Sequence, residues 1–174
     1  MDEEAAALVD RPLLRKVYVS PRDFRSPENY IFLPRWVMKS LDLSPFDTVD
    51  VSFVRIKLAA LVVLQPLTLA WDDLLLSSNA SPQSVLEHEV NKYSSLTAGA
   101  IITIEHKGVV YAFRVAETRA EGGVAVRGIR VQDSDVKVDI DRSVLDAIKK
   151  RREERLLAEE EEEKAKTRKG KSLV

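Results

Sequence analysis

The chain has 174 residues, 45% hydrophobic and 32% charged, enough apolar material for one folded body or two small ones. Its 27 Lys and Arg residues against 28 Asp and Glu residues leave a formal net charge of -1, which excludes nucleic-acid binding through a general basic excess. Cysteine is absent, which excludes disulfides, thiolate nucleophiles and cysteine-based zinc sites and favours a reducing compartment. We therefore expect protein partners and a cytoplasmic or nuclear location.

The first twelve residues are acidic at Glu3 and Glu4, contrary to the basic start of a secretory signal. The longest apolar run, Leu58 to Leu64, is far shorter than the roughly 20 residues that a membrane helix needs. We predict a flexible N-terminus over residues 1–12 and no membrane partner.

Residues 13–19 (LLRKVYV) alternate in the manner of a strand, and a turn-rich stretch follows them. Residues 30–33 resume β-type residues, and Pro34 suits a first helical turn because its missing N–H would have no partner there. Helical spacing then continues at Trp36, Val37, Ser40 and Leu41. We predict a strand, a loop, a second short strand and a short helix.

Residues 48–57 (TVDVSFVRIK) give the clearest strand pattern, with apolar and polar residues alternating at period two. Residues 58–65 are a fully apolar strand candidate that Pro66 stops. A second unit then begins, in which Ser81 is predicted to cap a helix that Pro82 opens. Leu86, Val90 and Tyr93 share one face of that helix, which predicts packing against a core.

Three β segments follow, at residues 100–106, 109–118 and 124–131, with glycine-containing turns between them. We predict that they pair as an antiparallel meander, closed by residues 136–140 (VKVDI).

A charged helix is predicted from Ser143, which we expect to cap it. From Glu159 its sequence is charge and alanine, typical of a solvated, fraying end. Alternatively, the helix docks on another helix through its apolar positions Leu145, Ile148, Leu156 and Leu157.

Reactive chemistry has few candidates in this sequence. His88 and His106 are the only histidines, and each fits an ordinary solvated or partly packed side chain. Glycine-rich phosphate loops, Gly-x-Ser-x-Gly elbows and zinc-ligand spacings do not occur. We predict no catalytic residue, metal or cofactor, and expect Trp36 and Trp71 to be core residues.

Residues 31–43 (IFLPRWVMKSLDL) resemble the Leu-Pro-x-Trp-Met-Met segment of the ubiquitin fusion degradation protein 1 family. Residues 61–66 (LVVLQP) resemble that family's strand ending in Gln-Pro, and residues 84–118 are similar to its second subdomain in the same order. The residues that carry the resemblance, for which we expect a mainly structural role, are Leu33, Pro34, Trp36, Met38, Gln65, Pro66, Leu86, Glu87, Leu96, Thr97, Gly99, Tyr111, Val115 and Glu117.

The resemblance implies an α+β, β-rich fold in which a double-psi β-barrel precedes a small α/β roll. Because the resemblance starts near Leu14, where the family has already formed a strand pair and a helix, we expect a partial barrel. The predicted domains are the partial barrel (residues 13–67), the roll (68–141) and a charged helical tail (142–174).

The resemblance also implies a non-catalytic adaptor of ubiquitin-dependent degradation, including degradation at the endoplasmic reticulum. Such an adaptor binds ubiquitin or polyubiquitin and, with a co-adaptor, links ubiquitylated substrates to an AAA ATPase unfoldase. The family's segments for the ATPase and the co-adaptor have no counterpart in residues 140–174, and no residue is assigned to ubiquitin contact.

Two other functions compete with this one. A partial barrel leaves unpaired strand edges, so the chain could be a homodimerising assembly module that does not bind ubiquitin. An enzyme on the same scaffold would need a processed serine or an aspartate dyad, and no matching stretch occurs.

Overall fold

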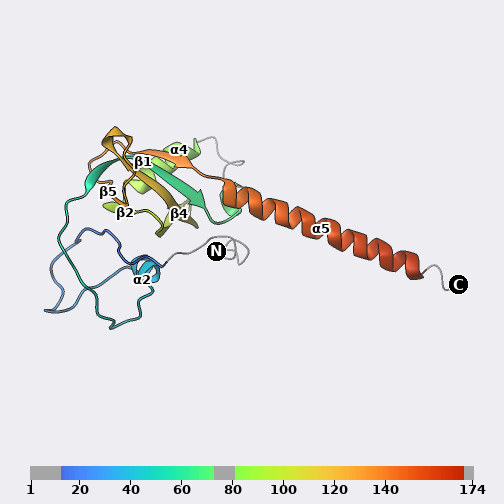
Figure 1. The fold of residues 1–174 in the computed structure, drawn as a ribbon, viewed down its shortest axis with the longest axis horizontal. Coiled ribbons are helices and arrows are strands. Elements are labelled where there is room, and N and C mark those ends of the chain that lie inside the picture. Colours follow the sequence, from blue (N-terminus) through green and yellow to red (C-terminus); the bar gives the residue numbers. More distant parts are fainter. Residues whose placement is uncertain (1–12, 73–80, 171–174) are drawn as a thin grey trace.

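The computed structural model describes residues 13–72 and 81–170, so the prediction for residues 1–12 lies outside it. The strands are β1 (Lys57–Pro66), β2 (Ser95–Thr97), β3 (Ile101–His106), β4 (Val109–Ala120), β5 (Gly128–Arg130) and β6 (Lys137–Ile140). The helices with defined bounds are α2 (Arg35–Leu41), α4 (Pro82–Val90), the 3-10 turn η1 (Glu121–Gly123) and α5 (Ser143–Gly170). The predicted α+β class is confirmed, because these elements form one curled, half-barrel sheet with helices around it (Figure 1).

Strand β1 is the centre of this sheet. It pairs antiparallel with β4, parallel with β6 over residues 61–64, and parallel with β5 at Lys57 and Leu58. Its apolar run is therefore covered on both edges, as expected for a strand without alternation. β1 falls within the predicted first domain yet shares its sheet with strands of the second, and the division after residue 67 stays a prediction.

The hairpin of β3 and β4 is confirmed. Its two-residue turn has positive φ at Lys107 (52°) and Gly108 (78°), the conformation that favours tight hairpins. The rest of the predicted meander is wrong. After a short approach in which the Val126 N–H donates to the Thr118 carbonyl, the chain leaves β4, and β5 pairs with β2 and β1. The reason is that β1 and β3 already occupy the two edges of β4.

Helix α2 confirms the predicted short helix, with Pro34 one position before it as the N-cap residue. Val37 is buried, whereas Trp36 is only half-buried. Helix α4 is also confirmed and buries Leu86 and Val90. The predicted cap at Ser81 is wrong in one respect, because its side chain makes no capping hydrogen bond and only its carbonyl accepts, from the Val85 N–H.

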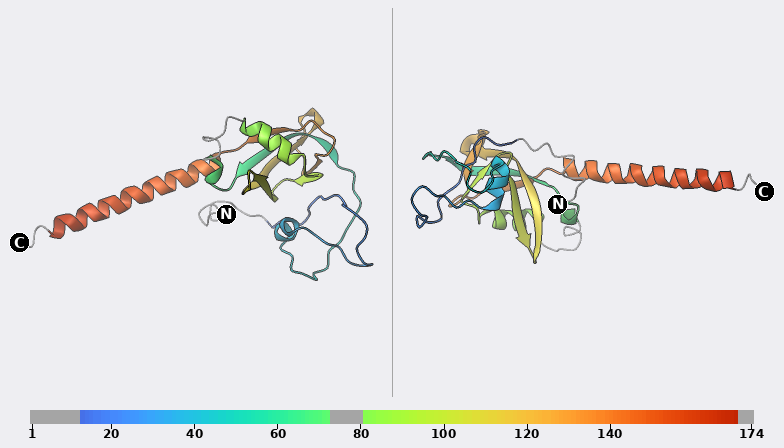
Figure 2. Two further views of the ribbon diagram at one scale, coloured as in Figure 1. Left: turned by 180° about the vertical axis from the view of Figure 1, so that it is seen from behind. Right: turned by 90° about the horizontal axis from the view of Figure 1, so that it is seen from below.

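The strands predicted at residues 13–19, 30–33 and 48–56 are not formed. These residues belong to a segment, which we call the arm (residues 13–56), that loops away from the sheet before re-entering it as β1 (Figures 1 and 2). The side chains of Val51 and Phe53 are 74% and 92% exposed. A strand exists only through a ladder of backbone hydrogen bonds to a neighbouring strand, and these arm residues take part in none of the strand pairs of the described chain.

The core lies between the sheet, α4 and the start of α5, and its cluster of buried side chains runs from Ala59 to Ile148. Trp71 is at its centre, edge-on to Tyr111 and Phe113 with ring centroids 5.4 and 5.0 Å away. The prediction that Trp71 is a core residue is therefore confirmed.

Helix α5 is attached only through its first turns. Leu145 and Ile148 are buried in the core, so the predicted docking stripe that combined them with Leu156 and Leu157 is wrong. Beyond these turns the helix projects from the body (Figures 1 and 2). The cap is also different, because Ser143 lies inside the helix and its N–H donates to the carboxylate of Asp141. No helix of the described residues is long and apolar enough to cross a membrane.

Candidate functional site

The arm returns to the sheet at one place, beside β2, and this junction decides how the arm is presented. The Tyr18 N–H donates to Thr97 Oγ1 (2.8 Å), and Ser95 Oγ donates to the Tyr18 carbonyl (3.0 Å). Both hydroxyl-bearing residues are buried, so each hydrogen bond satisfies a group that would be costly to leave unpaired. Two side chains of β2 thus hold the backbone of one arm residue.

Two glycines, Gly128 in β5 and Gly99 in the turn between β2 and β3, leave space for arm side chains. A Cβ atom on Gly128 would lie 2.2 Å from the Tyr18 ring, closer than any real contact. A Cβ atom on Gly99, whose φ is +90°, would lie 3.0 Å from Leu14 Cδ2. The Leu14 N–H in turn donates to the Ser40 carbonyl, which ties this stretch to α2.

Trp36 makes the third contact of the junction. Its ring lies edge-on to Tyr93, with centroids 6.0 Å apart. The Tyr93 hydroxyl donates to the Thr103 carbonyl (2.6 Å) and accepts from the Thr103 N–H (3.3 Å). Burial raises the pKa of Tyr93 above its ordinary value, because the charged phenolate would lose hydration.

Several of the residues that carry the family resemblance meet at this junction. Trp36 contacts Tyr93, while Thr97 and Gly99 receive Tyr18 and Leu14. In α2, the carbonyl of Pro34 accepts from the Val37 and Met38 N–H groups. Leu33 and Met38 are half-buried, and Leu96 is fully buried.

The remaining residues of that set lie elsewhere. Gln65 Nε2 donates to Asp141 (2.8 Å) and to Ser143 (3.0 Å) at the start of α5. Glu117 pairs with Arg119 on the surface (2.8 Å). Glu87 is half-buried on α4, and the other members are buried parts of the sheet and helix: Pro66, Leu86, Tyr111 and Val115.

A second anchor fixes α5 to the body. The carboxylate of Asp72, 9% exposed, forms ion pairs with Arg142 (2.8 Å) and Lys149 (2.5 Å), each 46% exposed. These pairs join the end of the first described segment to Arg142, the residue before α5, and to Lys149 within the helix. No local sequence pattern indicates these pairs, because Arg142 and Lys149 lie 70 and 77 residues after Asp72.

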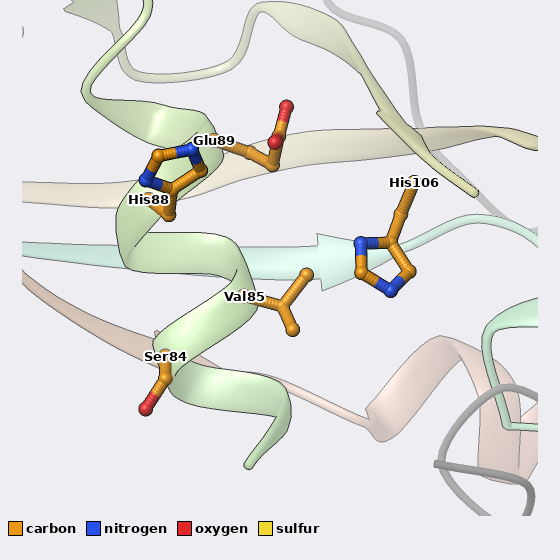
Figure 3. A pocket seen from close by; sticks show the side chains of 5 residues that line it. All are labelled: Ser84, Val85, His88, Glu89 and His106. Atoms are coloured by element: carbon orange, nitrogen blue, oxygen red, sulfur yellow. The ribbon is translucent and has the colours of Figure 1, made fainter. Parts of the chain in front are cut away.

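The two histidines, considered separately in the sequence, lie on one shallow hollow of about 250 Å³ with Ser84, Val85 and Glu89 (Figure 3). The Ser84 hydroxyl points away from His106, and Val85 lies between them. The Glu89 carboxylate is bound by Lys92 (2.6 and 2.7 Å). Among the described residues no three potential ligands are grouped to hold a metal ion. Among the residues that line this hollow, no nucleophilic side chain is therefore hydrogen-bonded to a histidine or a carboxylate that could act as its base.

The arm also carries an exposed aromatic surface that the sequence analysis did not identify. Four of the five phenylalanines are exposed, and so is Tyr30. Folded proteins rarely leave so many aromatic side chains in water unless a partner covers them. The exposed aromatic residues of the described chain are Phe24, Tyr30, Phe32, Phe46 and Phe53.

The part of the chain that forms the sheet is similar to a known protein family. The family described as ubiquitin fusion degradation protein UFD1, N-terminal subdomain 2, matches residues 58–143. The chain is 27% identical over 127 residues to the human ubiquitin recognition factor in ER-associated degradation protein 1, covering 73% of this chain and 38% of the relative. It is 26% identical over 117 residues to ubiquitin fusion degradation protein 1 of Saccharomyces cerevisiae, covering 67% and 30%.

A homologue from Caenorhabditis elegans is 26% identical over 134 residues, covering 77% of this chain and 36% of the relative. The aligned part of the chain thus spans between 30% and 38% of the length of these curated relatives. The matched residues begin at β1 and end at the first turn of α5, so they coincide with the sheet and its core. Over residues 58–143 the chain therefore matches the second N-terminal subdomain of the ubiquitin fusion degradation protein 1 family, and the curated relatives extend this similarity to between 67% and 77% of the chain.

Proposed function

We propose that this chain is a non-catalytic module that binds ubiquitin or polyubiquitin in ubiquitin-dependent protein degradation. The observation that carries the proposal is the family match over residues 58–143, together with relatives named for ubiquitin recognition and ubiquitin fusion degradation. In this role the sheet is a rigid support and the arm presents a surface. Substrate chemistry is left to other proteins.

The proposed contact surface is the aromatic loop, which we define as Phe24, Tyr30, Ile31 and Phe32. All four side chains are exposed, and Phe24 is 89% exposed. Protein interfaces concentrate their binding energy in aromatic side chains with polar groups around them. The contacts of Tyr18 and Trp36 flank the loop on both sides and limit its freedom, which lowers the entropic cost of binding.

An AAA ATPase unfoldase and a co-adaptor are proposed as further partners, in the cytoplasm or the nucleus. One relative is named for degradation at the endoplasmic reticulum, which supports that process as the setting. The non-catalytic character is supported by the hollow of His88 and His106, where the single carboxylate is already paired with Lys92.

The test is a titration of the isotope-labelled protein with lysine-48-linked ubiquitin chains, followed by amide chemical shifts. We expect saturable shifts centred on residues 24–32. Phe24→Asp and Phe32→Asp should each weaken binding by about tenfold or more, because a truncated aromatic anchor costs over 1 kcal/mol. Val110→Asp is the matched control, since Val110 is also exposed (61%) but lies on the hairpin of β3 and β4.

Two outcomes would contradict the proposal at different levels. The absence of shifts at near-millimolar protein would remove ubiquitin binding itself. If binding is saturable, but Val110→Asp weakens it and Phe24→Asp does not, the chain still binds ubiquitin. The contact surface would then be the hairpin of β3 and β4 and not the aromatic loop.

A further inference from the structure

We propose that residues 47–56, which we call the arm strand, pair with the arm strand of a second copy of this chain. The segment alternates apolar and polar residues, yet no hydrogen bond joins the backbone of residues 48–56 to any other described residue. Most of its side chains are exposed, among them Val51 and Phe53, whereas Val49 and Ile56 are half-buried. A sequence that favours a strand thus lies outside every strand and helix of the described chain, and unpaired segments of this kind associate with one another.

Strand β1, into which the arm strand runs, offers it no free edge. The arm strand continues directly into β1, and β1 is already flanked by β4 on one edge and by β5 and β6 on the other. A hydrogen-bonding partner for the arm strand must therefore come from a segment other than β1. An identical segment is chemically suited to this place.

The arm strand is complementary to itself in an antiparallel register centred on Val51. Residues 47, 49, 51, 53 and 55 share one face of a strand, because side chains alternate. In this register Val51 lies opposite its own copy, Phe53 opposite Val49, and Arg55 opposite Asp47. The face then has an apolar centre with an ion pair at each end, and the two-fold axis repeats every contact.

Electrostatics do not oppose this association, since the net charge of each copy is only -1. Two strands of ten residues form a small interface, so the dimer should be dependent on concentration. The proposed dimer uses the arm strand and leaves the aromatic loop at residues 24–32 free. It is therefore independent of ubiquitin binding, and either proposal can fail alone.

The first experiment is light scattering of the full chain over a range of concentrations. We expect the mass to rise from 19.6 kDa toward twice that value. Val51→Lys, which would place two ammonium groups opposite each other at the axis, should return the monomer, whereas the control Val110→Lys should dimerise normally. A wild-type monomer at near-millimolar protein would overturn the proposal.

A charge exchange tests the register. Arg55→Asp should weaken the dimer, because two carboxylates would then face each other at both ends, and adding Asp47→Arg in the same chain should restore it. Failure of the double variant to recover association, in a chain that remains folded, would rule out this register.

Asp47 also accepts a hydrogen bond from the Ser44 N–H (2.7 Å), so an independent measurement is needed. The chain has no cysteine, and single substitutions therefore report contacts without background. Val51→Cys should form a disulfide-linked dimer under mild oxidation much faster than Val110→Cys or Ser52→Cys. Equal rates for the three variants would contradict pairing at Val51.

Discussion

At the scale of single residues, Gly128 shows how closely the arm approaches the sheet. Gly128→Ala adds only one methyl group, but its position is 2.2 Å from the Tyr18 ring. We expect the substitution to displace the ring and to lower the free energy of unfolding by about 1–3 kcal/mol, the usual cost of overpacking. Denaturant unfolding followed by circular dichroism measures this change.

The control for this prediction is a double-mutant cycle with Tyr18. In a Tyr18→Ala background the space beside Gly128 is open, so Gly128→Ala should then cost much less than in the wild type. Equal costs in both backgrounds would mean that the Tyr18 ring does not rest against this glycine.

Tyr93 gives a prediction about pH. Burial raises its pKa above the ordinary value of 10.0, so the folded chain holds the phenol proton more tightly than the unfolded chain. This stabilisation is fully present below the ordinary value and is lost as pH rises through the higher folded pKa. Wild type should thus lose stability in alkaline solution, measured by denaturant midpoints at successive pH values.

Tyr93→Phe is the matched variant, because it keeps the ring beside Trp36 and removes the titrating group. In this variant the free energy of unfolding should fall less steeply at alkaline pH, and the remaining fall comes from other titrating groups. The same alkaline slope in both proteins would show that the phenol is not protected in the fold.

The limits of sequence-based prediction are clear for individual side chains. Burial of Leu86, Val90 and Trp71 followed from apolar spacing and size, since these properties are local. The sequence did not predict that His88 and His106 line the same hollow, or that the Tyr18 ring lies against Gly128. Such contacts depend on how strands are ordered in space, which no local pattern contains.

At the scale of elements, one carboxylate adds two ion pairs to the apolar attachment of α5. Asp72→Asn keeps the shape but removes the charge that binds Arg142 and Lys149. We expect a loss of about 1–2 kcal/mol, below the usual cost of breaking a buried pair, because both cations are partly exposed. Amide hydrogen exchange should also become faster in the first turns of α5.

The control for that substitution is Glu154→Gln on the same helix. Glu154 pairs with Lys150 at 3.9 Å in a fully solvated position, so its loss should cost less than about 0.5 kcal/mol. If both variants are equally destabilised, the Asp72 ion pairs do not anchor the helix.

Helices and the hairpin were predictable because their signals are local. Helix α2 and the turn at Gly108 followed from short sequence patterns and were confirmed. The arm strand failed for the opposite reason, since a strand pattern states what a segment favours but not whether a neighbour is present. β2 was missed because three residues are too few to show alternation.

At the scale of the whole molecule, the core cluster lies entirely between Ala59 and Ile148. A fragment of residues 57–150 should therefore unfold in one cooperative transition without the arm or the projecting part of α5. Differential scanning calorimetry and amide chemical-shift dispersion would measure this. A fragment with collapsed, poorly dispersed spectra would show that the arm is part of the folding unit.

The position of β1 in the sheet has a consequence for synthesis on the ribosome. Residues 61–64 are made early but pair with residues 137–140, so their last neighbour emerges 76 positions later. Strands β4 and β5 are made before β6, but until residue 137 has emerged the seven apolar residues from Leu58 to Leu64 lack part of the pairing along one edge. Nascent chains halted before residue 137 should consequently bind holdase chaperones. The chaperones should release the chain only after β6 has paired with β1.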